Sequence, residues 1–310
     1  MIHNLEPEAR SPKPETRNPP APGRGKPETL NPKPVWLPSE YLFFDCDSTL
    51  SAVEGIDELA RAKGLFEAVR RLTDAAMEGE VHLESVYDRR LQLLRPTRGE
   101  IRRLERLYRE TVVPDARPVI AALRRLGKRV FIVSGGLYPA VRPFGEWLGV
   151  PAENICAVEV TFDALSGEWW DYRRDRWGER PDVRYLRHEA GPLVQTTGKA
   201  DVVRRLKGGR PGRSMLIGDG VSDLAARPAV ERVVGFGGVV ARPAVVARAD
   251  VFIAANSLAP VLALATARPE RQQLAATPHE ETLRKGLDLI ADPAAVTFRN
   301  EAWRQAVLGG

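Results

Sequence analysis

Side chains able to do chemistry follow short apolar runs at several places in this chain of 310 residues. In LFFDCDSTLS, residues 42–51, Asp45 and Asp47 stand one residue apart. Two like charges this close repel each other and raise each other's pKa. A chain tolerates such a pair where a cation lies between the carboxylates or where the pair takes part in a reaction.

Three more groups of this kind occur further along the chain. They are Ser134 and Gly135 after RVFIV (129–133), Lys199 at a helix start before VVRRLKG, and Asp219, Gly220 and Asp223 after SMLIG (214–218). Carboxylate and backbone oxygens are ligands that suit Mg²⁺, and such an ion would relieve the repulsion among the aspartates. A serine beside glycine-flanked amides, together with a lysine, suits a phosphate group.

Together these groups indicate phosphoryl transfer. An aspartate beside Mg²⁺ and a bound phosphate is placed for in-line attack on phosphorus, which gives an aspartyl-phosphate. A second acid must protonate the leaving alkoxide and then deprotonate a water. Asp47 is two residues after Asp45, so strand alternation places both side chains on the same side. Each motif alone has a structural explanation, such as a turn or a helix cap; their order at successive strand ends supports the interpretation.

The elements that must position these groups are strands alternating with amphipathic helices from Tyr41 onward. The expected strands are residues 41–44, 129–133, 155–160, 214–218, 232–236 and 250–254. Near-continuous apolar strands alternating with helices predict a parallel sheet covered on both faces. This is a doubly wound, Rossmann-like α/β fold. Because ligands bind beyond the carboxyl ends of such strands, we expect the four groups to converge on one edge of the sheet.

Two segments interrupt this alternation. Residues 54–113 show helical periodicity without a strand run, which predicts an inserted helical bundle, and the tryptophan-rich residues 162–186 predict a small β-hairpin around SGE. The catalytic core is then expected at 41–53 and 114–267. A C-terminal helical extension is expected at 268–310, with helices at EETLRKGLDLIAD and EAWRQAVL whose role the sequence does not indicate.

Residues 1–40 form a proline-rich segment that differs from the rest. KPETRNP (13–19) returns as KPETLNP (26–32), and large apolar residues are few. Such sequence cannot bury enough apolar surface to offset its ordering entropy, so we expect a disordered leader. An inert tail is the favoured role; a docking segment for a proline-binding partner and a targeting segment are the alternatives, and acidic residues argue against the latter.

Composition excludes several classes of protein. The net charge of +5 comes from 46 basic against 41 acidic residues, which are interleaved, so we expect no nucleic-acid partner. Two cysteines, Cys46 and Cys156, build no disulfide framework. Cys46 is expected to point into the core, with a thiol role as the alternative. No apolar run is long enough for a membrane span or a secretory signal, which by default predicts a cytoplasmic protein.

The motifs resemble those of the haloacid dehalogenase superfamily of phosphotransferases, and within it the phosphoserine phosphatases. DCDST is similar to the first motif, SGG to the second, GK with Lys199 to the third, and GDGVSD to the fourth. EGIDELA (54–60) and VVGFGGVVARPAV (233–245) also resemble phosphoserine phosphatase segments. The resemblance covers roughly residues 41–262 and leaves out the leader and the C-terminal tail.

The resemblance implies a role for each matching position. It implies that Asp45 is the nucleophile and a Mg²⁺ ligand, and that Asp47 is the general acid/base and gives its backbone carbonyl to the metal. It implies that Asp219 is a further metal ligand, supported by Asp223 and Gly220. It also implies that Ser134, Gly135 and Lys199 hold the phosphoryl group, that Glu54 binds the substrate amine and that Arg90 binds the substrate carboxylate. It also implies that the helical insertion at 54–113 is a cap that closes over the site. Arginine pairs with a carboxylate in bidentate fashion, and a carboxylate accepts from an ammonium. The alternatives are a surface arginine for Arg90 and a helix N-terminal charge for Glu54.

Two departures from the family pattern bear on the substrate. Where the family has Met-Gly-Gly and then a phenylalanine, this chain has Met77, Glu78 and Gly79, and then Leu83. The expected activity is Mg²⁺-dependent hydrolysis of O-phospho-L-serine, the last step of serine synthesis. The alternatives are another small phosphomonoester, transfer of the phosphoryl group to an alcohol such as homoserine, and a non-catalytic binding protein. The expected partner is a small phosphomonoester, and a homodimer is left open.

Overall fold

A seven-stranded sheet organises the part of the chain that the computed structural model describes, which is residues 35–309 without 78–82, 169 and 171–179. Most of the expected leader, residues 1–34, lies outside the described residues. The strands follow one another across the sheet as β3 (Ile155–Val158), β2 (Arg129–Leu137), β1 (Tyr41–Phe44), β6 (Ser214–Gly218), β7 (Arg232–Phe236), β8 (Val251–Ile253) and β9 (Val296–Phe298). All neighbours are parallel except β8 and β9.

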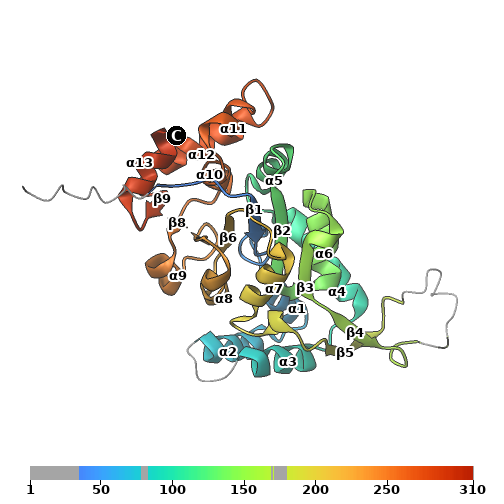
Figure 1. Ribbon diagram of the computed structural model, residues 1–310. Coiled ribbons are helices and arrows are strands. Elements are labelled where there is room, and N and C mark those ends of the chain that lie inside the picture. Colours follow the sequence, from blue (N-terminus) through green and yellow to red (C-terminus); the bar gives the residue numbers. More distant parts are fainter. Residues whose placement is uncertain (1–34, 78–82, 169, 171–179, 310) are drawn as a thin grey trace, which may run out of the picture. The chain divides into compact units, whose positions relative to one another are not determined.

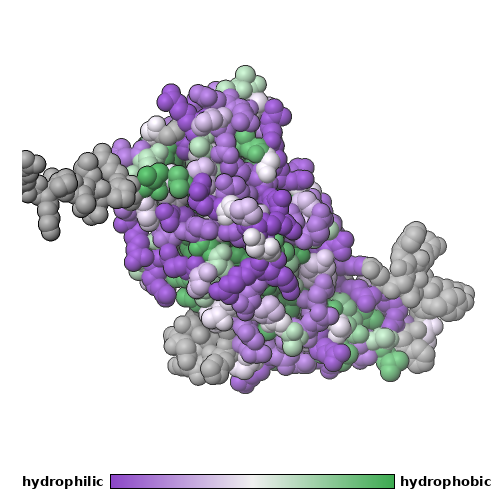
Figure 2. Space-filling view, viewed as in Figure 1, coloured by the Kyte–Doolittle hydropathy of each residue, from purple (hydrophilic) through white to green (hydrophobic). Residues whose placement is uncertain are grey.

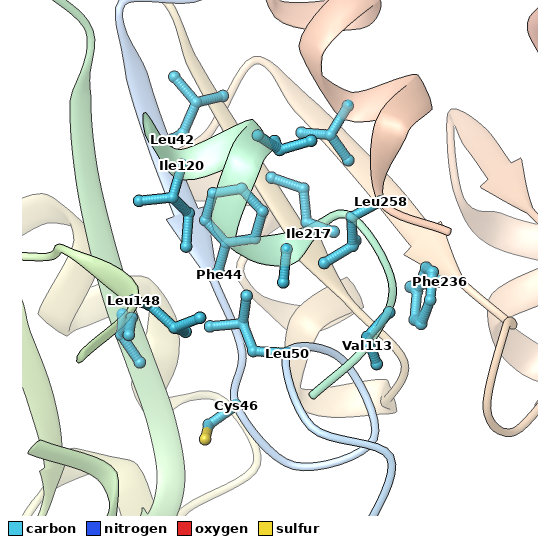
Figure 3. Close-up of a cluster of buried hydrophobic side chains, with 14 of the residues drawn as sticks. Leu42, Phe44, Cys46, Leu50, Val113, Ile120, Leu148, Ile217, Phe236 and Leu258 are labelled. Carbon is cyan, nitrogen blue, oxygen red and sulfur yellow. The ribbon is translucent and has the colours of Figure 1, made fainter. Parts of the chain in front are cut away.

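The two faces of the sheet are both apolar, as alternation along β1 shows. Leu42 and Phe44 join one buried cluster and Tyr41 and Phe43 the other, because successive strand side chains point to opposite faces. Cys46 continues the Leu42 side and is fully buried within the first cluster (Figure 3). The expectation that this cysteine points into the core is confirmed.

Helices cover each face, as a doubly wound fold requires. One face carries α7 (Gly198–Lys207), α8 (Val221–Ala225) and α9 (Pro243–Arg248); the other carries α5 (Ala116–Arg125), α6 (Tyr138–Leu148) and α10 (Ala259–Ala265) (Figure 1). Single 3-10 turns lie at η1 (Ala152–Asn154), η3 (Pro192–Val194) and η4 (Arg227–Ala229). The predicted fold class is confirmed.

The insertion between β1 and α5 consists of helices. They are α1 (Gly55–Ala62), α2 (Phe66–Met77), α3 (Leu83–Leu94) and α4 (Arg98–Glu110). Helix α4 begins with a capping box, in which the Thr97 hydroxyl accepts from the Glu100 amide and the Glu100 carboxylate accepts from the Thr97 amide. Its apolar side buries Ile101, Leu104 and Tyr108. The division into core, cap and extension at the expected residue limits stays a prediction.

The expected strand 155–160 is two strands. β3 pairs with β2 as far as Val158, and β4 (Val160–Asp163) pairs antiparallel with β5 (Arg184–His188). Glu159 between them is exposed, so the chain leaves the central sheet there because no strand continues beside it. The expected hairpin is present, but its first strand begins before residue 162.

The C-terminal segment contains more structure than the two helices expected. It holds α11 (Arg268–Gln272), α12 (Glu280–Ala291), β9 and α13 (Glu301–Gly309). Helix α12 packs closely on α10, since a Cβ at Gly286 would lie 2.3 Å from the Ala259 carbonyl oxygen. The segment therefore supplies both a helix against the core and the antiparallel edge strand.

The face of the molecule in Figure 2 is mainly hydrophilic. Apolar side chains gather beside the β4–β5 hairpin, where Leu165 and Leu186 are exposed. Among the described helices, none has the length and apolar character that a membrane crossing needs.

Candidate active site

The register of the sheet brings the sequence motifs to one edge. Phe44 of β1 pairs with Ile132 of β2 and with Ile217 of β6. Asp45 follows Phe44 directly, and its amide donates to the Ile217 carbonyl at 2.9 Å. Ser134 and Asp219 lie two residues beyond the residues paired with Phe44, so all three stand at a similar level across neighbouring parallel strands, toward their carboxyl ends.

The Ser-Gly-Gly motif lies within a strand and not in a turn after it. We expected the strand to end at Val133, but β2 continues to Leu137, with a register shift between Val133 and Leu137 against β3. This irregularity re-aims the backbone at the sheet edge. The Ser134 hydroxyl accepts from the Gly136 amide at 3.0 Å, and the Tyr87 hydroxyl donates to the Gly135 carbonyl at 2.9 Å.

Lys199, at the start of α7, joins two of the motifs. Its ammonium lies 2.6 Å from Asp45 Oδ2 and 2.6 Å from Asp223 Oδ1. Gly220 N donates to the other oxygen of Asp223 at 3.0 Å, which fixes that carboxylate. A Cβ at Gly218 would lie 2.1 Å from the Asp223 carboxyl carbon, so only glycine leaves room for this arrangement.

Asp45, Asp219 and Asp223 form a buried triad of carboxylates. Each offers one oxygen, and these oxygens lie within 4.8 Å of one another. Thr49 adds a hydroxyl 3.4 Å from Asp219 Oδ1. Asp223 therefore takes part in the side-chain cluster directly, whereas the expected contribution of Asp47 to a metal is a backbone oxygen.

The side chain of Asp47 is turned toward the helical insertion on one side and the Ser-Gly-Gly motif on the other. Its Oδ1 accepts from the Tyr108 hydroxyl at 2.7 Å and from Gly55 N at 3.0 Å. Its Oδ2 lies 2.9 Å from where a Cβ of Gly136 would stand, a point that is also 3.2 Å from Ser134 Oγ. Asp47 Oδ2 and Ser134 Oγ thus border the same small space.

Arg242, in the loop before α9, bridges the core and the insertion. Its Nε lies 3.0 Å from Asp219 Oδ2, and its Nη2 lies 3.3 Å from Glu54 Oε1. The Glu54 oxygen also accepts from the Ser48 hydroxyl at 2.8 Å. Arg242 thereby places Glu54 at the rim of the carboxylate cluster.

Burial dominates the electrostatics of the cluster. Loss of water raises the pKa of Asp47 to about 7; the Tyr108 hydrogen bond lowers it, and nearby Asp45 raises it further. Burial likewise raises the pKa of Asp219 to about 7 and that of Asp223 to about 7. The pKa of Lys199 is raised against its own burial by Asp223 and Asp45, so the lysine stays charged.

The cluster has more negative than positive groups. Among the described residues, its carboxylates are those of Asp45, Asp47, Glu54, Asp219 and Asp223, and the cations paired with them are Lys199 and Arg242. An excess of buried negative charge, with three oxygens converging on one point, fits a hard divalent cation with oxygen ligands. The residues present therefore fit Mg²⁺, the ion that the sequence motifs predict.

Arg90, on α3, is not bonded to the cluster. Its Nη1 lies 3.2 Å from Thr73 Oγ1, and its guanidinium lies over the Tyr87 ring, 5.6 Å from the centroid. Its Nε is buried and finds no hydrogen-bond partner among the described residues. Burial lowers its pKa, while Tyr87, Asp57 and Glu54 oppose that shift. Glu78 and the side chain of Leu83 lie outside the described residues.

Arg242 and Tyr108 are residues of the site that the sequence motifs do not indicate. Arg242 lies in the family-like stretch 233–245, but its position before a proline gave no sign of a contact with Asp219 or Glu54. Tyr108 belongs to an amphipathic helix, where a buried aromatic residue looks like ordinary core. The other expected residues, apart from Arg90, are brought together at the sheet edge.

Known proteins similar to this chain share both sequence and fold. The sequence model of one protein family, the haloacid dehalogenase-like hydrolases, matches residues 42–226 of this chain. A phosphoserine phosphatase of Drosophila melanogaster is 32% identical over 217 residues, 69% of this chain and 74% of that protein. The structure of DsGPDH of Dunaliella salina matches with a TM-score of 0.59 and 27% identity over 74% of this chain, which spans 36% of the Dunaliella chain.

A phospho-aspartyl intermediate analogue of phosphoserine phosphatase is also similar in structure. It matches with a TM-score of 0.58 and 25% identity, over 73% of this chain and 98% of that one. The chain belongs to the haloacid dehalogenase-like hydrolase family and is a phosphoric monoester hydrolase.

Proposed function

We propose that this enzyme hydrolyses O-phospho-L-serine to L-serine and phosphate through an aspartyl-phosphate on Asp45, with Mg²⁺ as its cofactor. One observation carries the proposal: Lys199 binds Asp45 and Asp223 at 2.6 Å each, at the point where the carboxylates converge. This arrangement places the carboxylate that would attack phosphorus beside the ammonium that would bind the phosphoryl oxygens. The phosphoserine phosphatases among its relatives support the choice of substrate.

In the first step, an oxygen of Asp45 attacks phosphorus. The ammonium of Lys199, the hydroxyl of Ser134 and the backbone of Gly135 surround the phosphoryl oxygens. They supply positive charge and hydrogen bonds where negative charge gathers in the transition state. The bond from phosphorus to the serine oxygen breaks, and its electron pair stays with that oxygen.

Asp47 handles the proton in both steps. As an acid it donates a proton to the leaving serine oxygen; as a base it takes a proton from the water that attacks the aspartyl-phosphate. Its raised pKa, about 7, suits a group that must be protonated for one step and ionised for the next. Mg²⁺, held by Asp45, Asp219 and the backbone oxygen of Asp47 with Asp223 in support, would neutralise phosphoryl charge.

The amino-acid part of the substrate is assigned to Glu54 and Arg90. Glu54 would accept from the substrate ammonium at the rim of the cluster, and Arg90 would donate to the carboxylate. Arg90 Nε has no hydrogen-bond partner among the described residues, which supports this assignment, because a buried charged donor without a partner is costly unless a ligand supplies one. The helical insertion would act as the cap that excludes water.

The test compares two substrates and two neighbouring arginines. In Arg90→Met, kcat/KM for phospho-L-serine should fall about 10- to 100-fold, the worth of a charged hydrogen bond. The value for phosphoethanolamine, which lacks the carboxylate, should change less than about threefold. Arg89→Met is the matched control, since Arg89 is exposed on the same helix. Equal losses on both substrates would contradict the assignment of Arg90.

A second candidate is hydrolysis of another small phosphomonoester. It is favoured by the hydrogen bond from Arg90 Nη1 to Thr73 Oγ1, because that bond already engages one nitrogen that a substrate carboxylate would need. If phosphoethanolamine is hydrolysed as well as phospho-L-serine, this candidate replaces the first. Transfer of the phosphoryl group to homoserine would show as phosphohomoserine when homoserine is added. A cytoplasmic compartment and a homodimer remain proposals from the sequence.

A further inference from the structure

Tyr108 holds the Asp47 side chain in one orientation. The Tyr108 hydroxyl and the Gly55 amide both donate to Asp47 Oδ1, at 2.7 and 3.0 Å. We propose that Tyr108 is a positioning residue, which keeps Oδ1 as an acceptor and so makes Oδ2 the oxygen that carries and transfers the proton. This inference rests on the proposed acid/base role of Asp47.

The geometry leaves Oδ2 facing the reaction. Oδ1 accepts two hydrogen bonds, which occupy its two lone pairs, so the acid proton belongs on Oδ2. Oδ2 lies 2.9 Å and Ser134 Oγ 3.2 Å from the point where a Cβ of Gly136 would stand, next to the space assigned to the phosphoryl group. The two donors thus aim the acid at the oxygen that leaves.

Packing in the hydrophobic core holds the Tyr108 side chain in place. Its side chain is fully buried on α4, and its ring packs against Phe144 with centroids 5.4 Å apart. The hydroxyl reaches Asp47 only because residue 55 has no side chain: a Cβ at Gly55 would lie 2.2 Å from Tyr108 Oη. Gly55 therefore contributes twice, with its amide and with the space that its missing side chain leaves.

The chemical step balances with Asp47 as the sole proton carrier. The bond from Asp45 to phosphorus forms, the bond from phosphorus to the alcohol oxygen breaks with its electron pair on oxygen, and that oxygen takes the proton from Asp47 Oδ2. In the second step a water gives its proton to Oδ2 and its oxygen to phosphorus, while the electron pair of the broken bond returns to Asp45. Tyr108 keeps its proton throughout.

The test uses leaving groups that differ in their need for a proton. Serine leaves as an alkoxide and needs the acid, whereas p-nitrophenol leaves readily as an anion. In Tyr108→Phe, kcat/KM for phospho-L-serine should fall about 10- to 100-fold, a part of the usual contribution of general acid catalysis. The value for p-nitrophenyl phosphate should stay within about threefold, because that reaction needs no acid.

The controls separate positioning from folding. Tyr185→Phe removes another buried hydroxyl, one that bonds to His188 and Asp88, and should leave the ratio of the two kcat/KM values unchanged. Gly55→Ala keeps the tyrosine but displaces its hydroxyl, and should lower the ratio of kcat/KM for phospho-L-serine to kcat/KM for p-nitrophenyl phosphate. This variant takes the place of Tyr108→Phe if Tyr108→Phe does not fold. An equal loss on both substrates in the folded variants would overturn the proposal.

Failure of the proposed substrate gives a different pattern. If the wild type hydrolyses β-glycerol phosphate and not phospho-L-serine, the substrate proposal fails, and Tyr108 is tested by the same ratio on β-glycerol phosphate. If the wild type hydrolyses p-nitrophenyl phosphate but neither alkyl phosphate, the proposal for Tyr108 is overturned, because no alkoxide is then protonated.

Discussion

Two sites with buried aspartate in this protein, a single residue and a cluster, are built in opposite ways. Asp250, before β8, is paired: Arg227 Nη1 reaches its oxygens at 2.8 and 2.9 Å, and the Val233 amide donates at 2.9 Å. At the carboxyl ends of β1 and β6, Asp45, Asp219 and Asp223 crowd within 4.8 Å around Lys199.

The difference separates a structural carboxylate from reactive ones. Asp250 has a cation and a backbone donor of its own, so its charge stabilises the junction of β7 and β8. The cluster at the sheet edge shares its cations among more carboxylates, and burial raises the pKa of Asp219 and Asp223 to about 7. A chain keeps such uncompensated charge where it serves binding or catalysis.

The largest expected effect comes from the nucleophile. Asp45→Asn should lower kcat for phospho-L-serine by at least about a thousandfold, because loss of a nucleophile removes the covalent route. The fold should be retained, since the amide is nearly isosteric. Phosphate release and circular dichroism measure the two effects. Substantial residual turnover in Asp45→Asn would contradict the covalent route.

Divalent metal should stabilise the cluster and leave the Asp250 pair unaffected. Adding Mg²⁺ to EDTA-treated protein should raise Tm, with a gain of about 2.7 kcal/mol at a concentration 100 times Kd. Thermal denaturation measures the gain. Asp219→Asn should lose most of it and Asp250→Asn should keep it. An equal gain in both variants would place the metal elsewhere.

The paired aspartate should matter for stability alone. Asp250→Asn should lower the free energy of unfolding by about 1–3 kcal/mol, because it weakens a buried charge pair whose arginine is partly exposed. Its kcat should stay close to the wild-type value. Urea denaturation and phosphate release check both parts. A large loss of kcat without a loss of stability would show that Asp250 acts in the site.

The smallest expected effect is the pH dependence of the metal-free protein. The folded-state pKa of Asp47, Asp219 and Asp223 is raised to about 7, so their contribution to stability is complete below the unfolded pKa, near 4, and is lost as pH rises through 7. The protein in EDTA should therefore be less stable at pH 8 than at pH 6, by on the order of 1 kcal/mol. Asp219→Asn should reduce this slope. A metal-free wild type equally stable at both pH values would contradict the raised pKa values.

The sequence predicted the strands that carry the site because local signals define them. The expected strands 41–44, 214–218 and 232–236 coincide with β1, β6 and β7, since each is a short apolar run bounded by polar or turn residues. β9 was missed because three residues, Val-Thr-Phe, show no strand pattern of their own. It exists because β8 offers an open edge beside the C-terminal helices.

The sequence predicted the meeting of the motifs but not all their neighbours. Residues that follow parallel strands share an edge by topology, so the convergence of Asp45, Ser134 and Asp219 required no side-chain detail. Tyr108 lies 61 residues from Asp47, and Arg242 lies 188 residues from Glu54, so no local pattern links either pair. Their contacts depend on how the insertion and the loop before α9 pack, which periodicity does not encode.

The central claim is that Asp45 carries the phosphoryl group during turnover. The most direct measurement is mass spectrometry of the enzyme, acid-quenched during steady-state hydrolysis of phospho-L-serine and digested with protease. The account predicts one phosphoryl adduct on the peptide that contains Asp45, and no adduct in Asp45→Asn. Turnover without an adduct on that peptide, or an adduct on another residue that persists in Asp45→Asn, would contradict it.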